Sequence, residues 1–439
     1  MPADPPLDRR RFLRGTVALW AVGIAGCASN PVSGRGELML VTPDEERELD
    51  RLRAPIQLSA DYGAIDDPAL VAYVGAVGAA VASTSQRRDL PWSFTPVDAL
   101  YVNAYAFPAG SVGVTRGMLL ELSSEAELAA LLGHETGHVN ARHAAARMSA
   151  GRVARMVVEG AAGLLEVIVP GADDLTDMAY GLGGLGAGLL LARYSREDER
   201  QADALGIAYM TAAGYPATGM VDLLGRLRDT SGARPDLVTT LFATHPMSDE
   251  RYARARREAK RYPSKEPPLH LRERYMEATA LLRRRRGAIV EGQKGERALR
   301  EGRFDDAAIH FALGIRRAPD DYALHLLSAR LTLAQKRPAE AIPLAEGAMA
   351  IKPGEPQAWQ VRGRARYALR EYDEALADFA RHTEALSGEG SSLFMQGICH
   401  ERMGDKEAAA AVWRRYLSLD RSSRLADYAA RRLEDYGEE

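Results

Sequence analysis

Residues 124–140 read SEAELAALLGHETGHVN and carry the strongest structural signal in the chain. The segment opens with Ser124 and, three residues later, Glu127, the pair that forms a capping box at the start of a helix. Mainly apolar and small residues follow, and no proline interrupts them. The segment therefore predicts an α-helix that places His134 and His138, four residues apart, on one face.

The HETGH sequence at 134–138 fits the pattern H-E-x-x-H, in which two imidazoles face one metal ion. Glu135 would reach a metal-bound water rather than the metal. Zinc lowers the pKa of that water, and the carboxylate takes its proton as it attacks a polarised carbonyl. We therefore expect one zinc ion per chain, held by His134 and His138, with Glu135 as the catalytic base. His143 would lie about 180° round the same helix from His134, which favours a structural role.

A catalytic zinc needs a third protein ligand, and a second acidic segment offers one. Glu199 and Asp203 lie on one face of a helix predicted over residues 196–213, with alanine and glycine beside them. Small residues would let this helix approach the first one closely. Glu199 could then bind the metal, and Asp203 could accept a hydrogen bond from a ligand histidine. The alternative is that both carboxylates are surface charges, and their spacing alone leaves the two readings open.

The last third of the chain has a period of 34 residues. Alanine recurs at that spacing, and a small residue stands twelve positions before each alanine. The alanines are Ala307, Ala341, Ala375 and Ala409. A 34-residue period with small residues where two helices cross is the tetratricopeptide signature. We expect four repeats, over 288–321, 322–355, 356–389 and 390–423, stacked as an α-solenoid and followed by a capping helix and tail over 424–439.

The N-terminal 26 residues have the pattern of an export signal. Arg9 and Arg10 resemble a twin-arginine signal, and the apolar core that follows is about ten residues long, too short to span a membrane. The core ends at Cys27 in a sequence that resembles a bacterial lipobox. In such signals the cysteine becomes the acylated N-terminal residue, and several acyl chains anchor a protein stably. The alternative is a soluble export signal with an incidental cysteine.

Composition and local patterns complete the predicted fold. The net charge of −3 gives no electrostatic case for nucleic-acid binding. Cys27 and Cys399 could in principle pair, but Cys27 has another use in the lipobox-like sequence, so we expect no structural disulfide. Cys399 should be a buried free thiol. The region between residue 40 and the HETGH helix predicts two helices, a strand over 92–97 and one or two strands over 101–122. Residues 152–193 predict a buried or lid-forming helix pair, with peripheral membrane contact as the alternative, and residues 263–287 predict a linker.

Three segments together resemble the HtpX-like and CAAX-prenyl-protease family of zinc peptidases, in its periplasmic BepA-type branch with C-terminal repeats. They are 134–138, 195–203 (SREDERQAD) and 244–246 (THP) with Arg251. The resemblance implies a mainly α fold, with a peptidase domain of helices and a small β-sheet at 27–262 followed by the repeats. It assigns Glu199 as the third zinc ligand. It also implies that residues 103–110 form a strand whose edge pairs with substrate.

The same resemblance gives His245 a place at the active site. His245 would either occupy the fourth zinc position and keep the enzyme latent, or help to stabilise the oxyanion; a structural histidine is the alternative. Because a residue before proline avoids helical conformation, His245 should lie on a turn or loop. Arg251 would pair with an active-site carboxylate, and the sequence does not indicate which one.

Two functions fit these features. The first is a zinc metalloendopeptidase of the bacterial envelope that removes misfolded or stalled proteins brought by the repeats. The second is a chaperone or assembly factor for outer-membrane proteins whose proteolysis is latent. In both, the partners are unfolded or misassembled envelope proteins bound through the repeat groove. The expected location is the periplasm, with acylated Cys27 anchoring the protein to the outer membrane.

Overall fold

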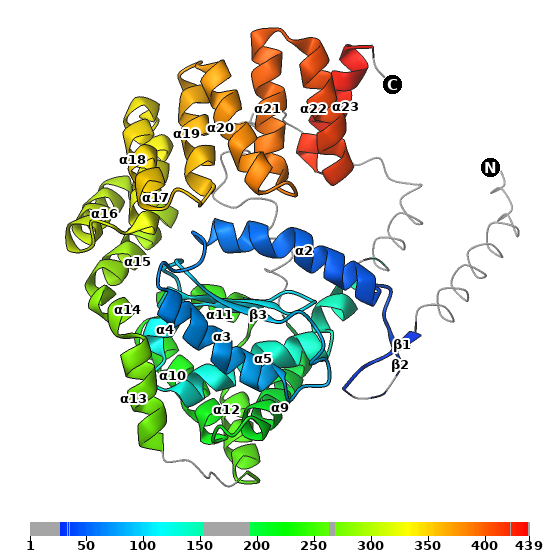
Figure 1. Ribbon diagram of the computed structural model, residues 1–439, viewed down its shortest axis with the longest axis vertical. Helices are drawn as coiled ribbons and strands as arrows, with labels where there is room; N and C mark the ends of the chain where they lie inside the picture. The colour runs from blue at the N-terminus through cyan, green and yellow to red at the C-terminus, as the bar shows by residue number, and fades with distance from the viewer. Residues whose placement is uncertain are drawn as a thin grey trace, which may run out of the picture.

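The computed structural model describes residues 27–32, 34, 36–150, 152, 194–262, 268–421 and 423–437. Helices dominate these residues, with two small sheets near the N-terminal end, which confirms the predicted mainly α fold (Figure 1). The export signal predicted over 1–26 and nearly all of the helix pair predicted over 152–193 lie outside the described residues. Within the described residues, no helix is both long and apolar enough to cross a membrane.

The peptidase part begins with a hairpin, two helices and a three-stranded sheet. Strands β1 (Cys27–Ser29) and β2 (Gly36–Leu38) pair antiparallel and lead to helices α2 (Pro43–Ala60) and α3 (Pro68–Ala82). The sheet has the order β3-β5-β4, formed by Ser93–Val97, Ser111–Thr115 and Ala104–Ala106. β5 pairs in parallel with β3 and antiparallel with β4, so β4 is an edge strand. The strands expected in this region are therefore present, followed by α4 (Arg116–Glu121).

Helix α5 (Glu125–Asn140) contains the HETGH sequence and is buried along its whole length. The Ser124 hydroxyl accepts a hydrogen bond from the Glu127 N–H, which is the first half of the predicted capping box. The Glu127 carboxylate accepts from the N–H and hydroxyl of Ser123 instead of the Ser124 N–H, so the second half does not form. Helix α9 (Arg196–Ala212) crosses α5 closely. A Cβ on Gly137 would lie 2.9 Å from the Ala202 carbonyl oxygen, and one on Gly206 would lie 2.9 Å from the His134 nitrogen. The small residues thus allow the close approach that brings side chains of both helices to one point.

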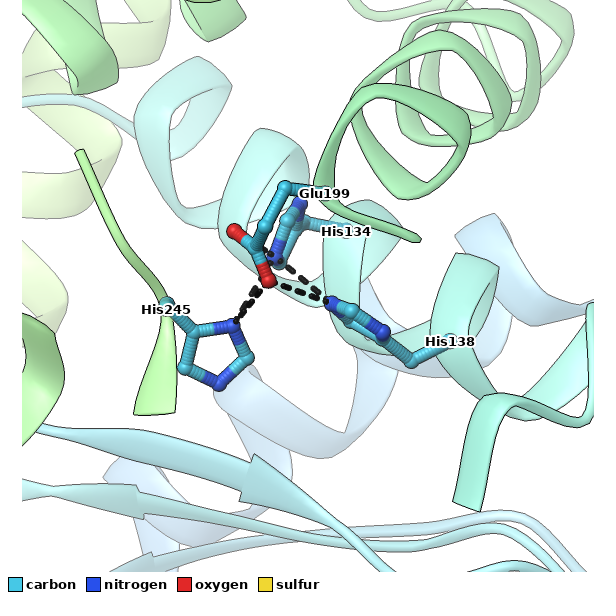
Figure 2. Close-up of side chains that lie close together, drawn as sticks. All are labelled: His134, His138, Glu199 and His245. Carbon is cyan, nitrogen blue, oxygen red and sulfur yellow. Dashed lines mark hydrogen bonds and ion pairs between the residues drawn. The ribbon is translucent and has the colours of Figure 1, made fainter. Parts of the chain in front are cut away.

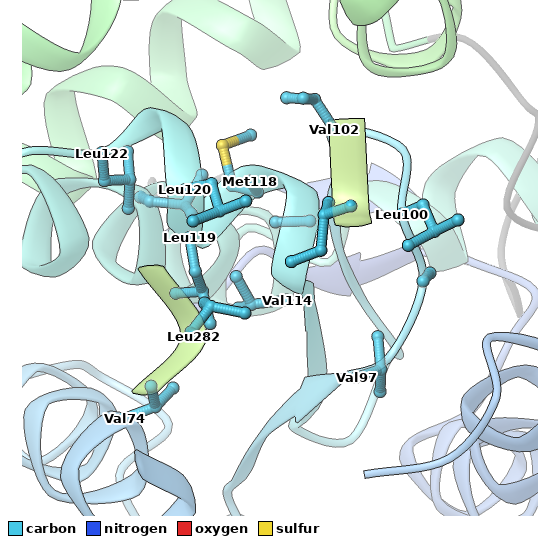
Figure 3. Close-up of a cluster of buried hydrophobic side chains, with 14 of the residues drawn as sticks. Val74, Val97, Leu100, Val102, Val114, Met118, Leu119, Leu120, Leu122 and Leu282 are labelled. Carbon is cyan, nitrogen blue, oxygen red and sulfur yellow. The ribbon is translucent and has the colours of Figure 1, made fainter. Parts of the chain in front are cut away.

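Further helices surround α5 and α9. They are α10 (Thr218–Ala233), the 3₁₀ helix η2 (Pro235–Val238), α11 (Thr239–Thr244) and α12 (Asp249–Ala259). Two more, α13 (Pro268–Ala278) and α14 (Ala280–Arg284), fall within the range expected to act as a linker. They pack on the peptidase domain: buried Tyr275 donates its hydroxyl to the Leu119 carbonyl, and Leu282 joins the core around Val74 and Met118 (Figure 3).

The C-terminal part is a solenoid of paired helices that arches over α2 (Figure 1). The eight repeat helices are α15 (Arg286–Arg300), α16 (Phe304–Arg317), α17 (Tyr322–Ala334), α18 (Pro338–Ile351), α19 (Gln357–Ala368), α20 (Tyr372–Ala385), α21 (Gly390–Met403) and α22 (Lys406–Leu419). Helix α23 (Arg424–Asp435) packs on the last pair. A Cβ on Gly397 would lie 2.5 Å from the Trp413 ring, which explains the small residue in each repeat. Cys399 is buried and free.

Repeats and peptidase domain share one hydrophobic core that runs from α3 to α19. The interface also contains buried ion pairs. Arg116 at the start of α4 makes two hydrogen bonds with Asp321 before α17, at 2.7 and 2.9 Å. Lys352 Nζ lies 2.9 Å from Asp98 Oδ2, and Ser59 of α2 donates to Glu355. The repeats are therefore docked on the peptidase domain rather than attached through a free linker.

Candidate metal centre

Four side chains from three segments converge at the crossing of α5 and α9 (Figure 2). His134 Nε2 lies 3.1 Å from His138 Nε2 and 3.3 Å from His245 Nδ1. Glu199 Oε1 lies 3.3 Å from His138 Nε2 and 3.0 Å from His245 Nδ1. All four residues are buried. The structure thus places the three ligands suggested by the sequence beside the histidine that was left with several possible roles.

The spacing of these four atoms fits a tetrahedral zinc ion. Ligand atoms bound at about 2.0–2.1 Å in a tetrahedron are about 3.3–3.4 Å apart. Four separations in the cluster are 3.0–3.3 Å, and His134 Nε2 lies 3.7 Å from the nearer oxygen of Glu199. His134 Nδ1 faces the Asp203 carboxylate at 3.0 Å, so Nδ1 carries the proton and Nε2 directs a lone pair into the cluster. Lone pairs and a carboxylate that meet in a buried site match the ligand set of a cation.

Asp203 and Arg251 support the cluster from behind. Arg251 Nη2 and Nε donate to the two oxygens of Asp203, each at 2.8 Å, and Arg251 Nη1 lies 2.5 Å from Glu199 Oε2. Burial alone would raise the pKa of Asp203, but Arg251 and His134 lower it. Arg251 therefore contacts two carboxylates of the site, Asp203 and Glu199, where the sequence named no partner. The contacts orient His134 and Glu199, as groups behind a metal ligand usually do.

His143 is closer to the cluster than helical geometry predicts, and the expectation that it points away from His134 on a continuous helix is wrong. Helix α5 ends at Asn140, and Arg142 has a positive φ of 57°, so the chain turns back. His143 Nδ1 then lies 2.9 Å from His138 Nδ1, and its Nε2 lies 2.9 Å from Gln201 Oε1. His143 thus bridges a candidate ligand on α5 to helix α9.

Glu135 is buried beside the cluster, as a base next to a metal-bound water would be. Its Oε1 lies 4.0 Å from His245 Nε2, and its Oε2 has no hydrogen-bond partner among the described residues. Burial raises the pKa of this carboxyl group. Burial would also raise the pKa of Glu199, but His245 and the hydrogen bond with His138 lower it below its ordinary value. The two carboxylates therefore have opposite tendencies, one to take up a proton and one to stay ionised.

The segment that carries His245 is packed into the domain, and Leu241, Thr244 and His245 are all buried. Helix α11 ends at Thr244, and His245 has φ −116° and ψ 83°, a non-helical backbone as expected before Pro246. The Thr244 carbonyl accepts a hydrogen bond from the Tyr194 N–H at 2.9 Å. The Tyr194 ring stacks on His138 with centroids 3.7 Å apart, and Arg147 lies over its other face. No sequence pattern pointed to Tyr194 or Arg147, because their role depends on this packing.

The segment 103–110 contains β4, which lies at the edge of the sheet and packs against α5. Tyr105 turns away from that edge and donates its hydroxyl to Asp61 at 2.6 Å. Burial raises the pKa of the Tyr105 hydroxyl well above its ordinary value, so it remains a donor.

Residues 68–259 match the model of Peptidase family M48. The chain is similar to the beta-barrel assembly-enhancing protease of Yersinia pestis, with 30% identity over 208 residues that cover 46% of this chain and 42% of the relative. The corresponding protein of Escherichia coli K12 is 29% identical over the same coverage. The mitochondrial metalloendopeptidase OMA1 of Schizosaccharomyces pombe is 28% identical over 50% of this chain and 63% of the relative. The matches thus span less than half of the two bacterial relatives.

Solved structures resemble the repeat region at low identity. The crystal structure of the MamA protein covers 34% of this chain and 88% of its own, with a TM-score of 0.31 and 15% identity. YrrB, described as a TPR protein, matches 47% of this chain and 97% of its own chain, again with a TM-score of 0.31 and 15% identity.

The match to the family model includes α5, α9 and the His245 segment, and therefore the whole candidate metal centre. Residues 68–259 of this chain are therefore a domain of peptidase family M48.

Proposed function

We propose that this protein is a zinc-dependent metalloendopeptidase of the bacterial cell envelope. The observation that carries the proposal is the buried convergence of His134, His138 and Glu199, with Glu135 one residue from the first ligand. Nitrogen and carboxylate ligands at these separations suit zinc, and two histidines with one carboxylate form a known catalytic set for this metal. The M48 domain match supports the same reaction class.

In this proposal, His134, His138 and Glu199 would hold a zinc ion, which would supply a Lewis acid that polarises a carbonyl and lowers the pKa of a water molecule. Glu135 accepts the proton of that water and then delivers it to the leaving amine, a role that suits a buried carboxyl group with a raised pKa. Asp203 and His143 hold the imidazoles of His134 and His138 in the required orientation. The edge of β4 offers backbone groups to an extended substrate, which would pair as an added strand.

His245 is proposed to keep the enzyme latent. Its Nδ1 atom lies within 3.0–3.3 Å of a ligand atom of Glu199 and of His134, so it completes a set of four. A catalytic zinc needs one position open for water or substrate. In this proposal His245 must therefore leave this set before hydrolysis. The alternative role, stabilisation of the oxyanion, would place His245 near the reacting carbonyl instead.

The envelope setting rests on the sequence and on the names of the relatives. Two relatives are named as beta-barrel assembly-enhancing proteases, which supports a role with envelope proteins. The proposed clients are misfolded or stalled envelope proteins, recruited through the tetratricopeptide repeats. Cys27 is proposed to carry the lipid that anchors the protein in the periplasm at the outer membrane. A second candidate function is the assembly of outer-membrane proteins by an enzyme whose proteolysis is latent. The position of His245 beside the other three candidate ligands favours this second function, because a fourth ligand would keep the peptidase inactive.

The test of the peptidase is Glu135→Gln. The substitution removes the base and keeps the metal ligands, so zinc content should be unchanged while casein hydrolysis is lost. Glu197→Gln on the exposed face of α9 is the matched control and should retain activity. Hydrolysis by Glu135→Gln at the wild-type rate, in protein free of contaminating protease, would end the proposal. A comparison of client maturation in a Glu135→Gln strain and in a deletion strain distinguishes the two proposed functions, protease and assembly factor.

His245→Ala distinguishes the two roles of that histidine by the sign of its effect. If His245 is the inhibitory ligand, the variant should show faster casein hydrolysis and self-cleavage with little change in zinc content. If it stabilises the oxyanion, kcat should fall by roughly 10²–10³. Wild-type activity in the variant would contradict both roles.

A further inference from the structure

The two histidines of the HETGH sequence are supported differently at the nitrogen that faces away from the cluster. His134 Nδ1 lies 3.0 Å from Asp203 Oδ1, so a carboxylate accepts its proton. His138 Nδ1 lies 2.9 Å from His143 Nδ1, so its partner is another imidazole. His138 Nε2 points into the cluster, 3.3 Å from Glu199 Oε1 (Figure 2). Because an imidazole nitrogen can donate or accept, the position of the proton on His138 depends on what lies behind His143.

Gln201 lies behind His143 and determines where the proton is. Its Oε1 carbonyl oxygen lies 2.9 Å from His143 Nε2 and can only accept a hydrogen bond, so His143 Nε2 carries a proton. The Asp198 carboxylate, 3.6 Å from the same nitrogen, is outside hydrogen-bond distance. In a neutral imidazole the other nitrogen is then an acceptor, and His138 Nδ1 donates to it. We call this hydrogen-bonded series, His138–His143–Gln201, the imidazole relay.

A sharp turn after α5 brings His143 into the imidazole relay. Arg142 has a φ of 57°, in the left-handed region that residues other than glycine rarely adopt. Arg142 Nε donates to Glu46 Oε1 at 3.0 Å, and Nη2 donates to the Val41 carbonyl at 2.8 Å. Arg142 and Glu46 are both buried. Buried hydrogen bonds to the segment 41–46 thus hold the turn, and they fix the position of His143.

Helix α9 supplies the other end of the imidazole relay. Gln201 lies on α9 between the candidate ligand Glu199 and Asp203, which accepts the proton of His134. The helix therefore supports both imidazoles of α5, one directly through Asp203 and the other through Gln201 and His143. The two supports differ in charge, because Asp203 is a carboxylate and Gln201 a neutral amide. The amide can set the position of a proton without adding a negative charge near the metal centre.

We propose that His143 and Gln201 are positioning residues that keep the proton of His138 on Nδ1 and so leave the lone pair of Nε2 available to zinc. The inference rests on the proposed zinc site, because the imidazole relay has this effect only if His138 is a ligand through Nε2. An imidazole without such support exchanges its proton between both nitrogens, and the form with the proton on Nε2 cannot bind a metal there. The imidazole relay therefore acts on the affinity for zinc.

The first test measures the zinc dissociation constant of the full chain by competition with a chelator. Gln201→Met removes the acceptor and should weaken zinc binding by about tenfold or more, the usual loss when a group behind a metal ligand is removed. Gln201→Glu keeps an acceptor oxygen and should stay within about threefold of the wild-type affinity. Arg200→Met is the matched control on α9, because Arg200 pairs with the exposed Glu197 and Glu250, and it should leave the affinity unchanged. Wild-type affinity in folded Gln201→Met would overturn the proposal.

The second test changes the turn that places His143. Glycine adopts a positive φ freely and valine does not, so Arg142→Gly preserves the turn and Arg142→Val strains it. In both variants Glu46 keeps its hydrogen bond from Arg87. Arg142→Val should weaken zinc binding by about tenfold or more, and Arg142→Gly by less than about threefold. Equal affinities in the two variants would refute the role of the turn. His143→Leu keeps the turn and should bind zinc as weakly as Gln201→Met; wild-type affinity there would refute the imidazole relay.

Nuclear magnetic resonance can locate the proton itself. Long-range proton–nitrogen spectra of zinc-loaded protein, labelled with nitrogen-15 at histidine, show which ring nitrogen carries the proton. His143 should be protonated at Nε2 and His138 at Nδ1, with the signals assigned through His143→Leu. A proton on His143 Nδ1 would overturn the proposal. Wild-type protein that binds no zinc would refute the proposed peptidase centre, whereas tight zinc binding that is insensitive to Gln201→Met would refute only the imidazole relay.

Discussion

Replacing Arg116 with methionine tests how strongly the repeats are bound to the peptidase domain. Arg116 and Asp321 are 4% and 0% exposed at their side chains and share two hydrogen bonds at 2.7 and 2.9 Å. Burial opposes ionisation of Asp321, but Arg116 holds its pKa below the ordinary value. Arg116→Met would leave that carboxylate buried without its partner. The expected loss in the free energy of unfolding is about 3–5 kcal/mol, the usual result of stranding one half of a buried pair.

The measurement is urea denaturation of the zinc-loaded full chain, followed by circular dichroism at pH 7.5. Arg116→Met with Asp321→Asn should recover at least half of the loss, because the neutral amide no longer needs the guanidinium and can still cap α17 through the Leu324 N–H. Arg261→Met is the control: its pair with Glu258 is solvent-exposed, with Arg261 73% exposed, and should cost less than about 1 kcal/mol.

Two results would refute this reasoning. A loss below about 1 kcal/mol in Arg116→Met would mean that the buried pair contributes no more than an exposed one. A double variant as unstable as the sum of the two single variants would mean that Arg116 and Asp321 are not coupled.

Three further predictions concern the metal, the pH dependence and the anchor. Glu199→Ala should lose most of its zinc while Glu197→Ala keeps it, measured as metal content of the purified proteins; full zinc in Glu199→Ala would show that another residue is the third ligand. Burial raises the pKa of Glu355 to about 7, so the folded protein keeps a proton that the unfolded chain releases above about pH 4.5. The free energy of unfolding should therefore fall as pH rises from about 5 to 7.5. Glu355→Gln should remove about 3 kcal/mol of that fall, measured by urea titrations at each pH. Parallel curves of unfolding free energy against pH for variant and wild type would contradict this prediction. Cys27→Ala should move the protein from the membrane to the soluble fraction, and a variant that still sediments with membranes would exclude acylated Cys27 as the anchor.

Features that depend on local chemistry or on a period could be predicted from the sequence. The HETGH helix needs only residues four apart on one helix, and the cap at Ser124 lies next to it. The repeats could be predicted from the 34-residue period, because each repeat contacts its neighbours in the same way. The small residues around Glu199 predicted that its helix approaches the HETGH helix closely enough for Glu199 to bind the metal. The spacing alone could not distinguish a metal ligand from a surface charge.

Features that depend on how distant segments pack could not be predicted. The contact of His143 with His138 requires the helix to end at Asn140, and nothing in the hydrophobic period marks that end. Tyr194 reaches His138 only because α9 crosses α5. The pairing of Arg116 with Asp321 joins residues 205 positions apart that carry no shared pattern. Each of these contacts is a property of tertiary structure, which a single sequence does not reveal.

The hydrophobic core shared by α3, α14 and the first repeat helices has a consequence for engineering and evolution. A repeat array taken from another protein would bring a surface that does not match the peptidase domain, so a simple graft would expose apolar side chains on both halves. Substitutions along the outer repeats are easier to accommodate, because Trp413 and Phe394 belong to a hydrophobic core separate from that of the peptidase domain. The last repeats can therefore change independently, whereas the first repeats and the peptidase domain must change together.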